Sequence, residues 1–330
     1  MIYIGINSNV YTNFGPQRIS YFNGSEVLHK SNNKIGNFEI FNRKTLNLIT
    51  TKRSFVLCDG ETKIHGKDDH GNSFVDPTKA RSLNLFYDII DGQEQYFIKP
   101  NGEKVKIEPN FCELFGFISC YCISVKKLID VSNKEIDFNP IKNEVIFNKI
   151  FHSLKKINGG DGIDFEKSGE SKTIKIADQN LSNYIDSVIY SNGFKKIPKF
   201  ILRNTIENKK RFLKGFIEIE DVFKTPPPDG KDYLFYSSYD INYCNDVFSL
   251  LTSIGIHAKL SINNDYCSVH LAAGSVIKSL DHIYDLISIT VPKCKHREDE
   301  IVSISQVDID CYGIDSDGFY CNGYYLKNSV

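Results

Sequence analysis

The chain has 330 residues, 41% of them hydrophobic and 25% charged, and a formal net charge of -1. This length is enough for two or more domains with buried cores. The near-neutral balance excludes nucleic-acid binding through net charge alone, so any such contact needs a local cluster of Lys and Arg. The most apolar stretch, 111–125, is too short to span a bilayer and contains Glu113. We therefore expect no membrane partner.

The nine cysteines are odd in number and lack a regular disulfide-like spacing. No signal peptide opens the sequence, so we expect reduced thiols and a cytoplasmic protein. A zinc site made of Cys294, His296, Cys311 and Cys321 is an alternative. Its spacing matches no common zinc pattern, and buried or incidental thiols are favoured.

Residues 1–105 are predicted to form short strands separated by polar turns. Asn-Gly and Asp-Gly pairs mark several of the turns, for example Asn23-Gly24 and Asp91-Gly92. This is the pattern of an all-β module. The predicted strands are 9–12, 17–22, 45–51, 54–59, 62–66, 83–90 and 94–100.

From about residue 106 the pattern changes to alternating helices and strands. Apolar residues on one face predict the helix near 242–255. The order suggests two copies of a helix-strand-strand-helix unit, with first helices offset by about a hundred residues. The predicted helices are 110–124, 143–156, 181–191, 207–223, 242–255 and 275–288. The predicted strands are a hairpin over 162–176, then 232–238, 257–262 and 266–271.

Strands resume at 300–314, 318–323 and 324–330. A β-rich module is thus predicted to be interrupted by an α/β module. Proteins tolerate such an interruption at exposed loop tips.

The last segment, FYCNGYYLKNSV, has an Asn-Gly turn, a strand, and then Asn328 and Ser329. An Asn side-chain amide can attack its own backbone carbonyl and form a succinimide. The hydroxyl of a following Ser can act as a nucleophile. The alternative is an ordinary solvated Asn-Ser pair near a chain end.

The segment SNVYTNFGPQRISYF has a V-x-T-x-x-G pattern followed by an apolar strand. Together with the final segment, it resembles an intein, a self-splicing Hint domain. The resemblance implies that Ser8 attacks the Asn7 carbonyl, that Asn328 cyclises, and that Ser329 is the downstream nucleophile. The family usually has His before the final Asn. Lys327 stands there and titrates poorly near neutral pH, so C-terminal cleavage is expected to be slow.

The segment ETKIHGKDDHGN resembles the T-x-x-H motif whose His donates a proton to the scissile amide nitrogen. The resemblance assigns this role to His70, with Lys67 in place of Thr. An exposed, inert histidine is the alternative. Near the C-terminus, Gly313 occupies a position that is often acidic or Cys in the family. That role is missing or is taken by Cys311 or Asp315.

The central module resembles a LAGLIDADG homing endonuclease, in which two helices pack through small residues and hold divalent metal at their feet. In FLKGFIEIED, Gly215 matches the contact glycine and Glu220 the metal-binding catalytic carboxylate. In ELFGFISCYC, Gly116 is kept, but Tyr121 stands where the first carboxylate belongs. A phenol is a poor Mg²⁺ ligand, so we expect double-strand cleavage to be lost or weakened.

The implied partners are double-stranded DNA, at an intein-free host allele, and the flanking host segments. The basic stretch 192–214 is a candidate DNA groove, and a solvated helix face is equally compatible with it. The resemblance implies no cofactor for splicing, and Mg²⁺ if the endonuclease is active. We expect a monomer.

The predicted fold class is α+β, an all-β Hint-like domain interrupted by a pseudo-two-fold α/β LAGLIDADG domain. The expected function is autocatalytic splicing with a degenerate DNA-binding insert. One alternative is a free-standing LAGLIDADG DNA-binding protein or endonuclease; another is a non-catalytic regulator. The expected boundaries are 1–7 for the N-extein remnant, 8–105 and 300–328 for the splicing domain, 106–299 for the endonuclease domain, and 329–330 for the C-extein start.

Overall fold

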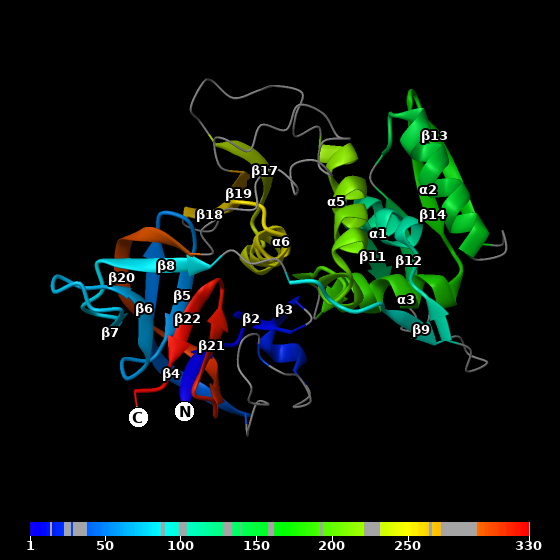
Figure 1. The fold of residues 1–330 in the computed structure, drawn as a ribbon. Coiled ribbons are helices and arrows are strands. Elements are labelled where there is room, and N and C mark those ends of the chain that lie inside the picture. Colours follow the sequence, from blue (N-terminus) through cyan, green and yellow to red (C-terminus); the bar gives the residue numbers. More distant parts are fainter. Residues whose placement is uncertain are drawn as a thin grey trace. The chain divides into compact units, whose positions relative to one another are not determined.

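The computed structural model shows a mixed α/β protein with one large antiparallel sheet (Figure 1). The chain divides into two compact units. The first comprises Met1–Gln95, Leu202–Ile206 and Val222–Val330, and the second comprises Tyr96–Ile201 and Glu207–Asp221. Both ends of the chain therefore belong to one unit. The structure describes residues 1–13, 15–22, 28, 38–86, 90–98, 104–127, 134–138, 140–157, 162–191, 194–220, 232–263, 266–271 and 296–329.

The large sheet of the first unit has eleven strands in the order β1-β5-β4-β20-β8-β6-β22-β21-β2-β3, with β7 beside β6. Its described pairings are antiparallel. The strands are β1 (Ile2–Gly5), β2 (Asn9–Thr12), β3 (Gly15–Arg18), β4 (Phe38–Thr51), β5 (Phe55–Cys58), β6 (Lys63–Lys67), β7 (Phe74–Val75), β8 (Ser82–Phe86), β20 (His296–Ile314), β21 (Gly318–Cys321) and β22 (Tyr324–Lys327).

The longest strand, β20, changes partners along its length. Residues 296–300 pair with β8, and most of the strand from Ile301 onward pairs with β4. The far end of β20 also pairs with β1, where Ile2 lies opposite Ile314. The sequence predicts shorter strands here, since the alternation is weak where a two-stranded ribbon leaves both faces partly in water. The result is that the first and last strands of the chain share one sheet.

A three-stranded sheet and a helix complete the first unit. Every residue of the helix from Tyr243 to Ser253 is buried, because the helix contacts the small sheet as well as β2 and β3. Asp240 caps its first turn by accepting hydrogen bonds from the backbone of Asn242 and Tyr243. The sheet has the order β17-β19-β18. The elements are β17 (Tyr233–Ser238), α6 (Ile241–Ser253), β18 (Ala258–Asn263) and β19 (Tyr266–Leu271).

The second unit contains a four-stranded sheet of order β11-β12-β14-β13 and most of the helices. Apolar residues of the helices and of one sheet face form its core, among them Phe115, Ile150 and Ile174. The elements are β9 (Tyr96–Ile98), β10 (Lys104–Lys106), α1 (Pro109–Tyr121), β11 (Cys122–Lys127), β12 (Lys134–Phe138), α2 (Glu144–Ile157), β13 (Ile163–Ser168), β14 (Ser171–Ile176), α3 (Gln179–Ile189), β15 (Tyr190–Ser191), β16 (Phe194–Lys195), α4 (Lys199–Leu202) and α5 (Ile206–Glu220).

Two local predictions are wrong, and one falls on residues that are not described. The strand expected over 17–22 ends at Arg18, and Ile19–Tyr21 form a short 3₁₀ turn instead. The helix expected over 110–124 ends at Tyr121, because Cys122–Lys127 pair with β12. The helix predicted over 275–288 lies outside the described residues.

The structure also bears on the membrane and zinc expectations. In the part of the chain that is described, no helix is long and apolar enough to cross a membrane. The described residues also contain no group of three His, Cys, Asp or Glu side chains that could hold a metal ion. Cys311 and Cys321 are buried free thiols, and Cys294 is not described. The zinc alternative therefore has no structural support among these residues.

Candidate functional site

Ser8 lies in the tight turn between β1 and β2. Its backbone N–H donates to the carbonyl of Gly5 at 3.0 Å, so the Asn7–Ser8 peptide bond is held in a turn. Asn7 is exposed, whereas Ser8 is only 2% exposed. The Ser8 hydroxyl has no hydrogen-bond partner of regular geometry among the described residues. The buried Ser8 hydroxyl therefore directly follows the Asn7 carbonyl group along the chain.

The thiol of Cys321 is a close neighbour of the Ser8 hydroxyl. Burial raises the pKa of Cys321 to about 12, and the contact with Ser8 offsets part of that rise. Val10 lies opposite Cys321 where β2 and β21 pair. The beginning of the predicted splicing segment is therefore packed against the last hairpin of the chain.

The last hairpin, β21–β22, turns at Asn322-Gly323 as the sequence predicts. Asn322 has a φ of 48° and Gly323 a φ of 88°, the left-handed conformations that an Asn-Gly turn supplies. At the open end of the hairpin, the Asn328 N–H donates to the Asp317 carbonyl at 3.0 Å. Asn328 is half-buried and Ser329 is exposed.

The two predicted cleavage points lie at opposite ends of this hairpin. Ser8 adjoins Cys321 near the turn, while Lys327 pairs with Gly318 at the open end. Gly318 and Cys321 are three residue steps apart along β21, a distance of about 10 Å. The conformation described here therefore does not bring Ser8 and Asn328 together.

His70 occupies a third place, in the exposed loop between β6 and β7. Strand β6 is three positions from β2 in the sheet, a separation of about 14 Å. The His70 backbone N–H donates to the Asp68 carboxylate at 2.9 Å. Lys67, predicted to replace the motif Thr, forms a 2.8 Å ion pair with Glu298. The sequence-predicted set Ser8, His70 and Asn328 is thus spread over one sheet.

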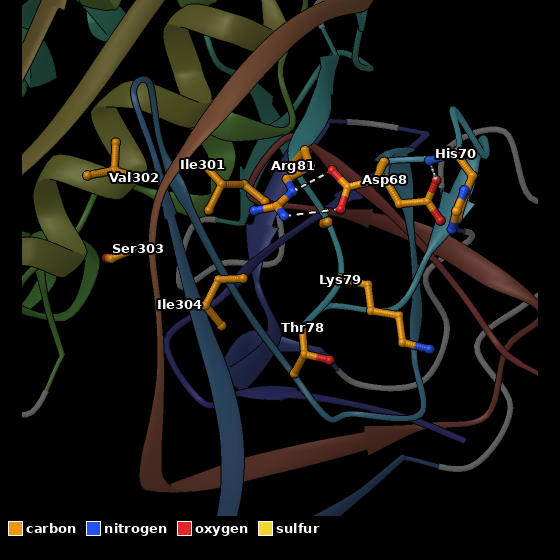
Figure 2. Close-up of a pocket in the computed structure, with 11 residues that line it drawn as sticks. Asp68, His70, Thr78, Lys79, Arg81, Ile301, Val302, Ser303 and Ile304 are labelled. Atoms are coloured by element: carbon orange, nitrogen blue, oxygen red, sulfur yellow. Dashed lines mark hydrogen bonds and ion pairs between the residues drawn. The ribbon is translucent and has the colours of Figure 1, made fainter.

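A hollow of about 550 Å³ adjoins His70 (Figure 2). Arg81 binds Asp69 on one side through two hydrogen bonds of 2.8 and 3.1 Å. Hydrogen bonding from Arg81 lowers the pKa of Asp69, and hydrogen bonding from the Asn72 side chain lowers that of Asp68. The other wall is the β20 segment 301–304. The hollow is an open, polar surface feature, not a closed active-site pocket.

A second histidine, which sequence reasoning missed, fits the T-x-x-H spacing better. Thr62 and His65 have that spacing, and the Thr62 hydroxyl donates to Asp59 at 2.7 Å. The His65 ring lies 5.3 Å from the Phe74 ring, over which the Lys327 ammonium sits at 5.2 Å. Burial lowers the pKa of His65. The T-x-x-H spacing of Thr62 and His65 in the sequence could have identified this histidine.

Gly313 lies where an acidic residue was expected, and the fold explains its size. A Cβ there would lie 2.6 Å from the Met1 sulfur and 3.0 Å from the Tyr3 ring. Strand β1 covers this position, so a larger side chain cannot fit without displacement. Of the two substitutes considered, Cys311 is buried and Asp315 is exposed.

Helices α1 and α5 of the second unit touch backbone to backbone. A Cβ on Gly116 would lie 2.1 Å from the Phe212 carbonyl oxygen, and one on Gly215 would lie 2.0 Å from the Glu113 carbonyl oxygen. Only glycine permits this approach, as the motif resemblance implies. Tyr121 and Glu220 are the last residues of their respective helices.

Glu113, a carboxylate on α1, is engaged in ion pairs. It is buried and lies 2.7 Å from Lys149, 3.6 Å from Arg211 and 4.0 Å from Lys214. It also precedes Tyr121 by about two helical turns, or about 12 Å. Glu113 therefore anchors basic side chains inside the unit and does not lie at the helix foot.

Much of the basic stretch 192–214 has internal roles. Lys209 is fully buried, and the Lys195 ammonium donates to the Ser119 carbonyl at 3.1 Å. Arg211 and Lys214 lie 3.6 and 4.0 Å from the Glu113 carboxylate. Several basic side chains of the candidate DNA groove are therefore engaged in contacts within the protein.

No protein-family model matches the chain, and no curated protein sequence matches it. Similar solved structures are homing endonucleases. Mesophilic variants of I-DmoI match at 12% identity with a TM-score of 0.38, over 56% of this chain and 97% of theirs. I-DmoI in complex with DNA and Ca matches at 12% and 0.40, over 56% and 91%. I-WcaI bound to its DNA recognition sequence matches at 10% and 0.35, over 57% and 84%.

Proposed function

We propose that the chain is a self-splicing protein that cleaves at Asn7–Ser8 and Asn328–Ser329. The observation that supports this best is the buried Ser8 hydroxyl, uncommitted among the described residues and adjacent to a peptide bond held in a turn. The placement of both chain ends in one sheet is consistent with it.

The first step is an acyl shift at Ser8. The Ser8 Oγ attacks the Asn7 carbonyl carbon, and the C–N bond to Ser8 breaks. The hydroxyl proton passes to the departing nitrogen, which becomes a free α-amine, and an ester replaces the amide.

The second cleavage is the cyclisation of Asn328, which must follow transfer of the upstream acyl group to Ser329 if the segments are to be joined. Its side-chain nitrogen attacks its own backbone carbonyl carbon, and the bond to Ser329 breaks to leave a succinimide and a free Ser329 amine. Lys327 is exposed and its ammonium lies over the Phe74 ring. A protonated Lys is a weak proton donor near neutral pH, so this step should be the slower one.

Joining the flanking segments requires the Ser329 hydroxyl to attack the Asn7 ester carbonyl while the Asn328–Ser329 bond is intact. The ester bond to Ser8 breaks and Ser8 regains its hydroxyl; after Asn328 has cyclised, the free Ser329 amine attacks the same carbonyl and displaces the Ser329 oxygen to form the amide. The hairpin separates these ends by about 10 Å, so the ends must close before ligation. We therefore expect the ester at Ser8 to accumulate, with ligation limited by closure.

Hydroxylamine cleaves esters and tests the first step in the intact chain. Treatment at pH 8 should release residues 1–7, which mass spectrometry detects. Ser8→Ala should abolish the release. The matched control is Ser54→Ala, which removes another buried, uncommitted hydroxyl of the same unit and should leave the release unchanged. If the folded wild-type chain does not release residues 1–7, the proposal is refuted.

Two variants test the second step, in a chain carrying a reporter after Val330. Asn328→Ala should leave the reporter attached, because no amide is available to cyclise. Lys327→His should accelerate its release. Reporter release by Asn328→Ala would show that the nucleophile is assigned to the wrong residue.

A second candidate function is binding of double-stranded DNA by the open face of the sheet β17-β19-β18. Backbone alternation puts Ser237, Ser268 and Ser261 in one cross-strand row on this face, and Lys259 beside His270. Hydroxyl, amide and basic groups are the ones that contact phosphates and base edges. The Gly116–Gly215 helix contact also favours this candidate, since it matches the LAGLIDADG resemblance.

The residues do not fit a catalytic Mg²⁺ site. At the helix feet the sequence offers one carboxylate, Glu220, and the phenol of Tyr121, whereas Mg²⁺ requires oxygen ligands such as carboxylates. The described residues contain no cluster that supplies the missing ligands.

The DNA candidate predicts salt-sensitive binding without double-strand cleavage. The measurement is a gel-shift titration at several salt concentrations, with and without Mg²⁺, on DNA spanning the intein-free site. Metal-dependent cleavage that Glu220→Gln abolishes would contradict the non-catalytic part. Absence of any salt-dependent shift would contradict the binding part.

A further inference from the structure

We infer that helix α6 is a positioning element for Ser8, and that Asp246 is its central residue. The inference rests on the proposed chemistry at Ser8. Helix α6 comes from the segment 106–299 that the sequence assigns to the endonuclease module, yet it packs in the first unit against β2 and β3.

Asp246 holds one side chain from β2, which follows the Ser8 turn, and one from β3, which pairs with β2. Arg18 donates to its carboxylate twice, from Nε at 2.9 Å and from Nη2 at 2.6 Å. Asn9 donates through Nδ2 to the same carboxylate at 3.3 Å and to the Ser249 hydroxyl at 3.1 Å. Arg18 is 5% exposed, Asn9 1% and Asp246 0%.

The last hairpin holds the backbone of the same residue. The Asn9 N–H donates to the Asn322 side-chain oxygen at 2.9 Å, and the Asn322 N–H donates to the Asn9 carbonyl at 2.8 Å. From α6, Asn245 donates to that same side-chain oxygen at 3.1 Å. Asn9 is therefore fixed at its backbone and its side chain.

Ser8 directly precedes Asn9, so the contacts that fix Asn9 also restrict the position of Ser8. Its own carbonyl accepts from the Ile19 N–H at 2.9 Å, one residue after Arg18. The Asp246 contacts therefore reach β2, which follows Ser8, and the end of β3, next to the residue that binds the Ser8 carbonyl. A displacement of about 1 Å in a reacting group can lower a rate about 100-fold, so this network can govern the acyl shift.

A buried ion pair is a weak device for stability alone. Removing two charges from water costs several kcal/mol, and a well-packed apolar pair often serves stability as well or better. What the pair supplies is a single geometry, because the forked guanidinium fits the carboxylate in one orientation. That specificity is useful at a reacting segment.

The test is Asp246→Asn in the full chain carrying the C-terminal reporter. The isosteric amide removes the charge but keeps the volume. Hydroxylamine release at Asn7–Ser8 should fall at least about tenfold. Cleavage at Asn328–Ser329 in the same molecules should stay within about twofold, because that end of the hairpin is about 10 Å from the network. A general folding defect would lower both.

Tyr11→Phe is the matched control variant. It removes the 2.7 Å hydrogen bond between Tyr11 and Thr252 at the same helix–strand interface, and it keeps the Asp246 carboxylate that Arg18 and Asn9 bind. Release at Ser8 should be unchanged. If Asp246→Asn leaves release at Ser8 unchanged, or lowers both cleavages equally, the inference is overturned.

A wild-type chain that releases nothing at Ser8 would refute the proposed function, and the inference would then be decided by hydrogen exchange. The Asn9 amide should exchange at least about tenfold faster in Asp246→Asn than in Tyr11→Phe, because its clamp is loosened. Equal exchange in the two variants would overturn the positioning role as well.

Discussion

The four-stranded sheet that contains β13 and β14 and the three-stranded sheet β17-β19-β18 differ in the side chains on their open faces. Each packs helices on one side. In the first sheet, Asp164 lies opposite Lys175, and Lys175 forms an ion pair of 2.5 Å with the exposed Glu166. In the second, serines, Lys259 and His270 occupy the corresponding face, and the Ser268 hydroxyl lies 2.9 Å from the His270 Nε2.

The two halves of the predicted repeat therefore carry different groups on these faces. Carboxylates on an open face repel phosphates, whereas hydroxyl and basic groups attract them. The helices differ in the same way. Helix α6 is held by a buried ion pair, whereas α1 is held by bare backbone contact at a glycine. Four variants test this comparison.

The largest effect is expected from Asp246→Ala. It leaves the buried Arg18 guanidinium without its carboxylate, which should lower the free energy of unfolding by about 3–5 kcal/mol. The double variant Arg18→Met with Asp246→Leu should recover most of that loss. Urea unfolding followed by tyrosine fluorescence measures both, since the chain has no Trp. A loss below about 1 kcal/mol for the single variant would mean that α6 is not held by this pair.

Gly116→Ala tests the other helix. The added Cβ would meet the Phe212 carbonyl at 2.1 Å, so the second unit should lose about 3 kcal/mol through overpacking. The control is Gly169→Ala in the same unit, where a Cβ meets nothing within 4 Å and only the positive φ of 60° is strained. It should lose about 1 kcal/mol. Equal losses would argue against a backbone-contact interface.

Lys259→Ala tests the open face of β17-β19-β18. If this face binds DNA, affinity should fall and the slope of log K against log salt should decrease by about one phosphate contact. Lys175→Ala on the other sheet is the matched control and should leave DNA affinity unchanged. Equal effects of the two variants would remove the distinction between the sheets.

The smallest effect concerns His270. Burial lowers its pKa, and the charge of Lys259 adds to this. The unfolded chain therefore takes up this proton first as pH falls, so stability should decline once pH drops below the unfolded pKa. It should level off below the lowered folded pKa. His270→Gln should flatten this segment of the curve. An unchanged pH profile would mean that His270 is not linked to folding.

Local sequence patterns predict one turn, one helix contact and the splicing hypothesis. The Asn322-Gly323 turn follows from local conformational preference, and the glycines of the α1–α5 contact follow from a motif in which only glycine fits. The order of Ser8, Asn328 and Ser329 carried the splicing hypothesis. These features depend on neighbours in the chain, so a single sequence reveals them.

The contacts of Asp246 and the distances between the predicted site residues depend on the three-dimensional fold. Asp246 lies more than two hundred residues from both Arg18 and Asn9 along the chain, and no local pattern links an ordinary Arg to an Asp in a later helix. The structure also separated Ser8, His70 and Asn328, because their distances depend on strand order in the sheet. Strand order arises from long-range backbone hydrogen bonds, which are the same for every side chain and leave no signature in sequence.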